Sequence, residues 1–189
     1  LKSILKIYEI YQTKTKDLNA FDFGDLILFC VKLFEEHKDI RELYQKNFKY
    51  ILVDEFQDTN FIQNKWLNLL VNKEENICCV GDDDQSIYSW RGAEIKNFLT
   101  FDKIYKNCKV FKLEQNYRST KNILDTASNL ISNNSNRVGK KLWSSANQGE
   151  LVKLNCYRTG KEEAQGISDI IEQKIKKKYS LNDVSILVR

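Results

Sequence analysis

The sequence contains no methionine and no proline, and it has a single histidine. Because a gene product begins with methionine, we expect the chain to be a fragment of a longer protein. His37 lies in a polar, helical context, so we expect a solvated surface residue rather than a catalytic one. No apolar run approaches the length of a membrane-spanning helix, and no charged-then-apolar leader opens the chain. Neither a membrane anchor nor an export signal is therefore expected.

Cysteine is present in a pattern that excludes two of its common uses. The five cysteines are an odd number and form no CxxC pair, so neither a disulfide framework nor a zinc site is supported. Two of them lie inside an apolar run and are expected to be small core residues. A reducing cytosol fits such usage, and we expect a cytoplasmic protein. The cysteines are Cys30, Cys78, Cys79, Cys108 and Cys156, and the two in the apolar run are Cys78 and Cys79.

The composition is typical of a soluble globular chain. With 189 residues, 42% of them hydrophobic and 30% charged, the chain is long enough for one domain or for parts of two. The net charge of +4 permits nucleic-acid binding without requiring it. The run Lys176–Lys178 ends a predicted helix, where cations favour the helix dipole, so we interpret it as a solvated helix end before a phosphate contact.

Two short apolar runs organise the predicted fold. Residues 50–53 run directly into Asp54 and Glu55, and residues 77–80 run into Gly81–Gln85. Unbroken apolar runs of this length predict strands buried on both faces, as in a parallel sheet. A helix predicted at about 61–71 separates them, so the three elements predict a βαβ unit with a right-handed crossover. The predicted fold class is α/β.

The remaining elements follow from helical spacing, capping residues and alternation of apolar residues. Helices are predicted at 3–16, after Asp22, at 39–47, at 94–101, at 120–131 behind a Ser119 cap, and after the capping box of Thr159 and Glu162. Strands are predicted at 110–113, 151–157 and 184–188. The polar segment 133–149 is predicted to be a loop or hinge.

The residues after three of the predicted strands suit phosphoryl transfer from a nucleotide. Asp54 and Glu55 follow the first strand, Gln85 follows the second, and Tyr117 and Arg118 follow the third. In an open α/β sheet, ligands bind beyond the carboxyl ends of the strands. Carboxylates there can hold Mg²⁺ on the phosphates and deprotonate the attacking water, while a glutamine and an arginine can contact the γ-phosphate. A tyrosine beside that arginine can stack on a base.

Tyr88, Trp90 and Arg91 form a different kind of cluster. Aromatic side chains interleaved with arginine provide a platform for single-stranded bases, and each stack contributes roughly 1–3 kcal/mol. The alternative is that the two aromatic residues belong to the core, which composition alone favours.

Residues 51–60, 80–93 and 113–120 resemble, in sequence, order and spacing, three motifs of the UvrD/PcrA/Rep family of superfamily one DNA helicases. The resemblance implies a RecA-like P-loop NTPase fold, with residues 1–115 forming the C-terminal part of a first motor domain and residues 116–189 the N-terminal part of a second. Residues 19–26 resemble an upstream segment of the family, with Gly24 at an often acidic position, and residues 139–143 resemble the start of the second motor domain.

The resemblance implies an ATP-dependent helicase or translocase that moves 3′ to 5′ on single-stranded DNA, with single/double-strand junctions as further substrates and DNA repair as its process. The implied cofactors are ATP and Mg²⁺. For the nucleotide, it implies that Asp54 and Glu55 bind Mg²⁺, that Glu55 also activates water, that Gln85 couples the γ-phosphate to DNA, that Tyr117 stacks on adenine and that Arg118 reaches the γ-phosphate.

For DNA, the resemblance implies contacts from Tyr88, Trp90 and Arg91. Gln57 and Asp58 match the motif and are expected to make supporting contacts only. The acidic run Asp82–Asp84 is expected to structure its loop rather than to bind metal. No GxxxxGK[ST] phosphate loop occurs in the sequence, so these residues alone are not expected to hydrolyse ATP.

Two alternatives remain open. One is a metal-dependent nuclease that uses Asp54, Glu55 and Asp82 as a two-metal carboxylate cluster. It predicts DNA cleavage with Mg²⁺ and no nucleotide, and it leaves Gln85, Trp90 and Arg118 without roles. The other is a non-catalytic DNA-binding module that keeps the fold without the motor.

Overall fold

The computed structural model describes residues 2–188, which separate into two compact units. The larger unit contains the chain up to Gln115 together with Ser128–Trp143, and the smaller contains Asn116–Ala127 together with the chain from Ser144 onward. The division falls inside helix α7 (Lys121–Ile131), so one helix contributes to both units.

The sheet of the larger unit confirms the predicted βαβ unit. Strand β1 (Ile51–Val53) pairs in parallel with β2 (Ile77–Cys79), with Ile51 opposite Ile77 and Val53 opposite Cys79. Helix α4 (Phe61–Leu70) connects them and begins at an Asn60 capping box. Only these two strands form a sheet among residues 2–188.

The prediction that these strands are buried on both faces is wrong. The side chain of Leu52 is 79% exposed and Cys78 is also exposed, because no described element covers their face. Cys79 points to the covered face, where burial raises the pKa of its thiol to about 12. Cys79 therefore fits the predicted core role, whereas Cys78 does not.

The three further predicted strands do not form. Residues 110–113, 151–157 and 184–188 carry no strand in the structure. A strand needs a partner for its backbone groups, and none of the described residues pairs with these segments. Leu113, for example, is 85% exposed, and the nearest pairing is a single bridge between Gln115 and Trp143.

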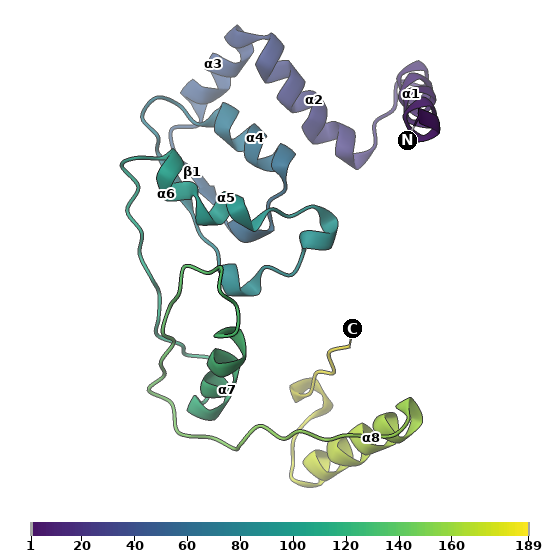
Figure 1. Cartoon of the computed structure of the whole chain (residues 1–189), viewed down its shortest axis with the longest axis vertical. Coiled ribbons are helices and arrows are strands. Elements are labelled where there is room, and N and C mark those ends of the chain that lie inside the picture. Colours follow the sequence, from purple (N-terminus) through teal and green to yellow (C-terminus); the bar gives the residue numbers. More distant parts are fainter. Residues whose placement is uncertain (1, 189) are drawn as a thin grey trace. The chain divides into compact units, whose positions relative to one another are not determined.

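Three helices predicted from local sequence signals precede the sheet, and the second and third of them pack against the connecting helix α4. Helix α1 spans Lys2–Asp17, α2 spans Phe23–Glu36 and α3 spans Lys38–Asn47. Asp22 caps α2 by accepting the Asp25 N–H at 2.8 Å, while Asp25 accepts the Asp22 N–H at 3.2 Å. Figure 1 shows α2, α3 and α4 lying together, and each contacts the other two. The core of this unit includes Val31, Phe34, Phe56, Leu67 and Leu70.

The predicted helix at 94–101 is two short helices. Helix α5 spans Ile95–Leu99 and α6 spans Phe101–Ile104, with a break at Thr100. Phe101 places its ring edge-on to Phe56, at a centroid distance of 5.5 Å. The break therefore lets both short helices cover the residues that follow β1.

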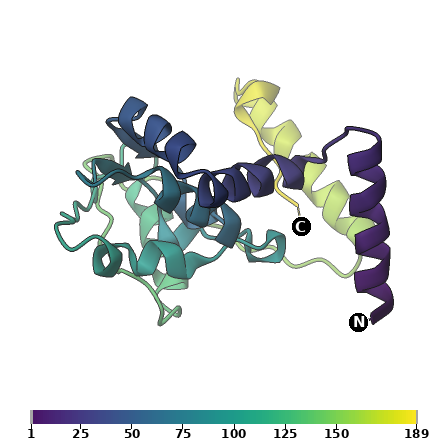
Figure 2. The ribbon, with the colours of Figure 1, turned by 90° about the horizontal axis from the view of Figure 1, so that it is seen from above.

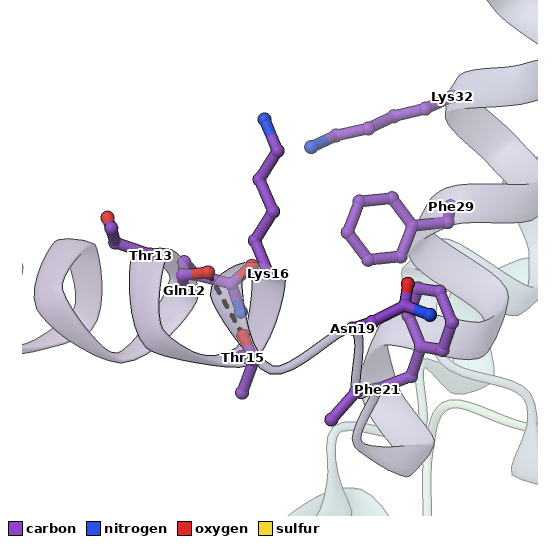
Figure 3. A pocket seen from close by; sticks show the side chains of 9 residues that line it. Gln12, Thr13, Thr15, Lys16, Asn19, Phe21, Phe29 and Lys32 are labelled. Atoms are coloured by element: carbon purple, nitrogen blue, oxygen red, sulfur yellow. Dashed lines mark hydrogen bonds between the residues drawn. The ribbon is translucent and has the colours of Figure 1, made fainter.

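A hollow of about 490 Å³ lies between α1 and α2 (Figure 3). Helix α1 runs across the direction of α2 (Figure 2). The ring of Phe29 meets Phe21 edge-on at 5.6 Å, and the Lys32 ammonium lies 5.2 Å from the centre of the Phe29 ring. Lys16 extends toward the same space. Among the described residues, no carboxylate lines this hollow, and none of its lining residues lies at a strand end.

The smaller unit is organised by α7 and by helix α8 (Gly160–Lys176). The backbone N–H of Lys121 at the start of α7 donates to Asn147 O at 3.2 Å. Thr159 caps α8 by accepting the Glu162 N–H at 3.2 Å, as predicted, but the Glu162 carboxylate accepts from Arg158 N rather than from the cap. None of the helices within residues 2–188 is long and apolar enough to cross a lipid bilayer.

Candidate active site

The chain turns sharply where β1 ends. Glu55 adopts a left-handed backbone conformation, with φ 49° and ψ 43°, and a 3-10 turn, η1 (Phe56–Asp58), follows. Such conformations are uncommon outside glycine and cluster at functional sites. The Asp54 carboxylate accepts the Glu55 N–H at 2.9 Å. Both acidic side chains are exposed at the strand end, as the sequence predicts.

Gln57 joins the ends of the two strands. Its side chain is 1% exposed, and its Nε2 donates to Glu55 Oε2 at 2.8 Å. Its Oε1 accepts the backbone N–H of Asp82 at 3.0 Å. Backbone bonds from Val80 N to Val53 O and from Phe56 N to Val80 O, at 2.8 and 2.9 Å, extend the ladder to this point. Residues that follow β1 and β2 are thus held against each other.

The loop after β2 is held by its first aspartate. Asp82 begins a 3-10 turn, η2 (Asp83–Gln85), and accepts the Asp84 N–H at 3.0 Å. Its other oxygen accepts from Gln85 Nε2 at 2.7 Å. Gln85 is exposed, and this bond directs its side chain back onto the loop.

Two basic residues bind the acidic run. Arg137 makes a two-pronged contact with Asp84, with Nε 2.9 Å from Oδ1 and one terminal nitrogen 2.5 Å from Oδ2. Lys140 forms an ion pair with Asp82, and the Val138 N–H donates to Asp83 at 2.7 Å. Burial opposes ionisation of Asp82, but the hydrogen bonds from Lys140 and Gln85 outweigh it and hold the pKa of Asp82 below its ordinary value.

The three aspartates lie close enough together to bind a metal ion. However, they already accept from two cationic side chains and from backbone amides. These contacts fit the expected loop-structuring role. Asp58, which follows Gln57, has a buried Oδ1 with no hydrogen-bond partner within residues 2–188.

Replacing Lys140 with methionine is expected to destabilise the 82–85 loop by about 1 kcal/mol at pH 7, the scale of a partly screened ion pair. Because the pKa of Asp82 is lowered in the folded protein, this contribution is present above its unfolded value of about 3.9 and is lost as pH falls through the lower folded value. Hydrogen exchange of the loop amides at neutral and acidic pH measures this contribution to the stability of the loop. Lys141→Met is the matched control, and equal effects of both variants at pH 7 would contradict the assignment.

Tyr88, Trp90 and Arg91 lie on the surface around a third 3-10 turn, η3 (Ser89–Arg91). Trp90 is 78% exposed, so the core alternative is wrong for its ring. The Tyr88 and Trp90 ring centres are 6.5 Å apart, and the Arg91 guanidinium lies 5.5 Å from the first and 5.6 Å from the second. The three side chains form one accessible cluster.

Tyr117 and Arg118 belong to the smaller unit. The Asn116 carboxamide oxygen accepts the N–H groups of Arg118 and Ser119 at 3.0 and 2.8 Å, which shapes the turn before α7. Both Tyr117 and Arg118 have exposed side chains. The structure therefore groups Asp54, Glu55 and Gln85 in the larger unit and this pair in the smaller.

The bridging position of Gln57 and the contribution of Arg137 and Lys140 are not apparent from the sequence. Gln57 lies two residues from Glu55, but its second partner is 25 residues further along the chain. The basic pair lay in a segment predicted as a polar loop. The one sequence signal that could have indicated this contact is charge. The negative charges of Asp82–Asp84 would repel one another without cationic partners, and a basic cluster occurs later in the chain.

Comparison with known proteins identifies the class to which this arrangement belongs. A family model described as the UvrD/REP helicase N-terminal domain matches residues 1–106, and one described as the UvrD-like helicase C-terminal domain matches residues 111–189. The chain belongs to the UvrD/REP helicase family.

Individual relatives are similar in sequence to this chain along nearly its whole length. A probable DNA helicase II homolog of Rickettsia conorii is 47% identical over 97% of this chain and 28% of its own length. DNA helicase II of Haemophilus influenzae is 44% identical over 98% of the chain and 25% of its own length. ATP-dependent DNA helicase PcrA of Bacillus subtilis is 45% identical over 97% of the chain and 25% of its own length. The chain thus spans about a quarter of the length of these relatives.

Proposed function

We propose that this chain is part of an ATP-dependent DNA helicase that couples ATP hydrolysis to 3′-to-5′ movement on single-stranded DNA in DNA repair. The observation that carries the proposal is the set of hydrogen bonds that links Glu55 to the loop bearing Gln85 across the ends of two parallel strands. The name of the Bacillus subtilis relative, an ATP-dependent DNA helicase, supports it.

In the proposed reaction, Glu55 takes a proton from water as the water oxygen attacks the γ-phosphorus. The bond from the γ-phosphorus to the β–γ bridging oxygen breaks, which yields ADP and phosphate. One Glu55 oxygen is held by Gln57, and no other hydrogen bond or ion pair to this carboxylate is present within residues 2–188, so the second oxygen is open to water. Gln85 contacts the γ-phosphate and couples phosphate binding to the neighbouring cluster of Tyr88, Trp90 and Arg91.

Asp54 fits a role as ligand of Mg²⁺. Its carboxylate is exposed at the strand end, one oxygen accepts the Glu55 N–H, and no hydrogen bond to the other is present in the described part of the chain. Carboxylate oxygens suit a hard divalent cation, and Glu55 lies beside it. Mg²⁺, when bound with the nucleotide, neutralises phosphate charge.

In the smaller unit, Tyr117 stacks on adenine and Arg118 neutralises charge on the γ-phosphate. Their exposed side chains support these roles. Residues 1–115 and 116–189 then belong to two successive RecA-like motor domains. No GxxxxGK[ST] loop occurs in these residues, so the reaction requires the full-length protein. The five cysteines are free thiols, which supports a place in the cytoplasm.

Tyr88, Trp90 and Arg91 provide the single-stranded DNA contact. Stacking on exposed rings is sequence-tolerant, and the guanidinium favours the phosphate backbone. The nuclease alternative needs Asp82 as a metal ligand, but its carboxylate is already bonded to Lys140, Gln85 and the Asp84 amide. Hydrolysis of DNA by the full-length protein with Mg²⁺ and no nucleotide would favour that alternative.

The proposal is tested by measuring ATP hydrolysis by the full-length protein as single-stranded DNA is added. We expect DNA to stimulate hydrolysis, and we expect Trp90→Ala to raise the DNA concentration for half-maximal stimulation by about 5- to 150-fold, because a base stack contributes roughly 1–3 kcal/mol.

Phe23→Ala is the matched control, because Phe23 is an even more exposed aromatic residue at 92% but lies at the start of α2, outside the cluster. It should leave the half-maximal DNA concentration unchanged. Equal DNA requirements for wild type and Trp90→Ala would remove the DNA assignment of this cluster. A wild-type protein that binds DNA without hydrolysing ATP would favour the non-catalytic binding module.

A further inference from the structure

The side chain of Gln57 is polar and is nevertheless among the most deeply buried in the chain, at 1% exposure. A buried amide is unfavourable unless its hydrogen-bonding groups are satisfied. Here both ends of the amide have partners: Nε2 bonds to the Glu55 carboxylate at 2.8 Å and Oε1 to the Asp82 backbone N–H at 3.0 Å.

The orientation of this amide follows from its partners. The Asp82 N–H can only donate, so it must face the carboxamide oxygen of Gln57. The NH₂ group is then left to face Glu55, whose ionised carboxylate can only accept. Both partners require the same orientation of the amide, so Gln57 donates a charge-assisted hydrogen bond to the Glu55 carboxylate.

The chain also leaves room for this amide. Gly81 precedes Asp82, and a Cβ at position 81 would lie 2.5 Å from Gln57 Oε1. A glycine here thus permits the approach of the Gln57 side chain to the Asp82 backbone. The small size of Gly81, after β2, thus allows the hydrogen bond that Gln57, after β1, makes with Asp82.

Asp82 continues the connection. Its backbone N–H binds Gln57, and its carboxylate binds Gln85 Nε2 at 2.7 Å. An unbroken series of hydrogen bonds therefore runs from Glu55 through Gln57 and Asp82 to Gln85. We propose that Gln57 is a positioning residue, which fixes the Glu55 carboxylate for attack by water and sets its place relative to Gln85. This inference rests on the proposed hydrolysis of ATP.

The reason that Glu55 needs such a partner is its exposure. An exposed glutamate samples several side-chain rotamers, and only some of them direct an oxygen at the reacting water. The left-handed backbone of Glu55 fixes the direction of its Cβ, and the bond from Gln57 is what restrains the carboxylate beyond it.

The test uses the full-length protein and Gln57→Met, which keeps the side-chain length but removes the donor. We expect kcat for DNA-stimulated hydrolysis to fall by about 10- to 100-fold, because misplacing a catalytic group by about 1 Å has effects of this order. The KM for ATP and the affinity for single-stranded DNA should change by less than about twofold, because Gln57 touches neither ligand in the proposed role.

A double-mutant cycle separates positioning from general support of the fold. In a Glu55→Gln background, where no carboxylate remains to be positioned, Gln57→Met should change the single-turnover rate by less than about twofold. Equal losses in both backgrounds would overturn the inference, as would an unchanged kcat in Gln57→Met.

Two further variants keep the test decisive. Gln63→Met removes a glutamine that accepts the Asn60 N–H at 2.9 Å in the α4 capping box, and it should leave kcat unchanged. If Gln57→Met does not fold, Gln57→Glu retains an oxygen for the Asp82 N–H, and at a pH at which both carboxyl groups are ionised it has no donor for Glu55 and should show the same loss of kcat. Full activity of that variant overturns the inference. A wild type without DNA-stimulated hydrolysis overturns the proposed function as well, whereas an inactive Glu55→Gln beside a fully active Gln57→Met overturns only the inference.

Discussion

Replacing Glu55 with glutamine in the full-length protein is expected to lower the rate of DNA-stimulated ATP hydrolysis by about 10²- to 10⁴-fold, the range attributed to a well-placed general base. The amide has nearly the same shape as the carboxylate but cannot accept a proton from water. Binding of ATP and of single-stranded DNA should persist, because the proposed contacts to both come mainly from other residues. Single-turnover hydrolysis and equilibrium binding of a fluorescent ATP analogue measure the two properties separately.

The matched control is Glu36→Gln, which removes the same negative charge at the exposed end of α2. It should leave turnover unchanged. If Glu55→Gln hydrolysed ATP at the wild-type rate, Glu55 would not be the base, and the proposed reaction would need another group at the strand end. Loss of ATP binding in Glu55→Gln would instead point to a role in holding the nucleotide and Mg²⁺.

The features that the sequence predicts correctly are encoded locally. Asp22 and Asp25 form the capping box of α2 within four positions, and the apolar run before Asp54 forms β1. The parallel pairing of β1 with β2 follows from the helix between them, because a parallel connection must cross over. The exposed acidic pair after β1 follows from the abrupt change from apolar to charged residues.

The features that were predicted wrongly or missed depend on distant partners. Residues 110–113 have the composition of a strand, but a strand forms only where a neighbouring backbone supplies hydrogen bonds, and none of the described residues does so. Nothing in the sequence around Gln57 indicates that it bridges two strand ends. This role depends on the fold, which places the Asp82 N–H against its side chain. The same holds for Lys140, whose partner lies 58 residues earlier in the chain.

Gly81→Ala is expected to destabilise the ends of β1 and β2 by about 2–6 kcal/mol. The added Cβ would lie 2.5 Å from Gln57 Oε1, 2.9 Å from Phe98 Cε2 and 3.2 Å from Phe56 N. Neither Gln57 nor Phe56 can move freely, because both are almost fully buried. Overpacking of this kind has a typical effect of about 1–3 kcal/mol, and displacing the Gln57 amide would leave buried polar groups unpaired at a further cost of about 1–3 kcal/mol.

Hydrogen exchange of amides in segments 51–58 and 77–82 of the full-length protein measures this loss where it arises. Gly160→Ala is the matched control, because nothing lies within 4 Å of a Cβ at that position in the first turn of α8, and alanine favours a helix. Unchanged exchange in Gly81→Ala would mean that Gln57 can leave its site without consequence. In that case the link between Glu55 and the Gln85 loop would not be rigid, whereas faster exchange together with a lower kcat ties the packing at Gly81 to the position of the Glu55 carboxylate.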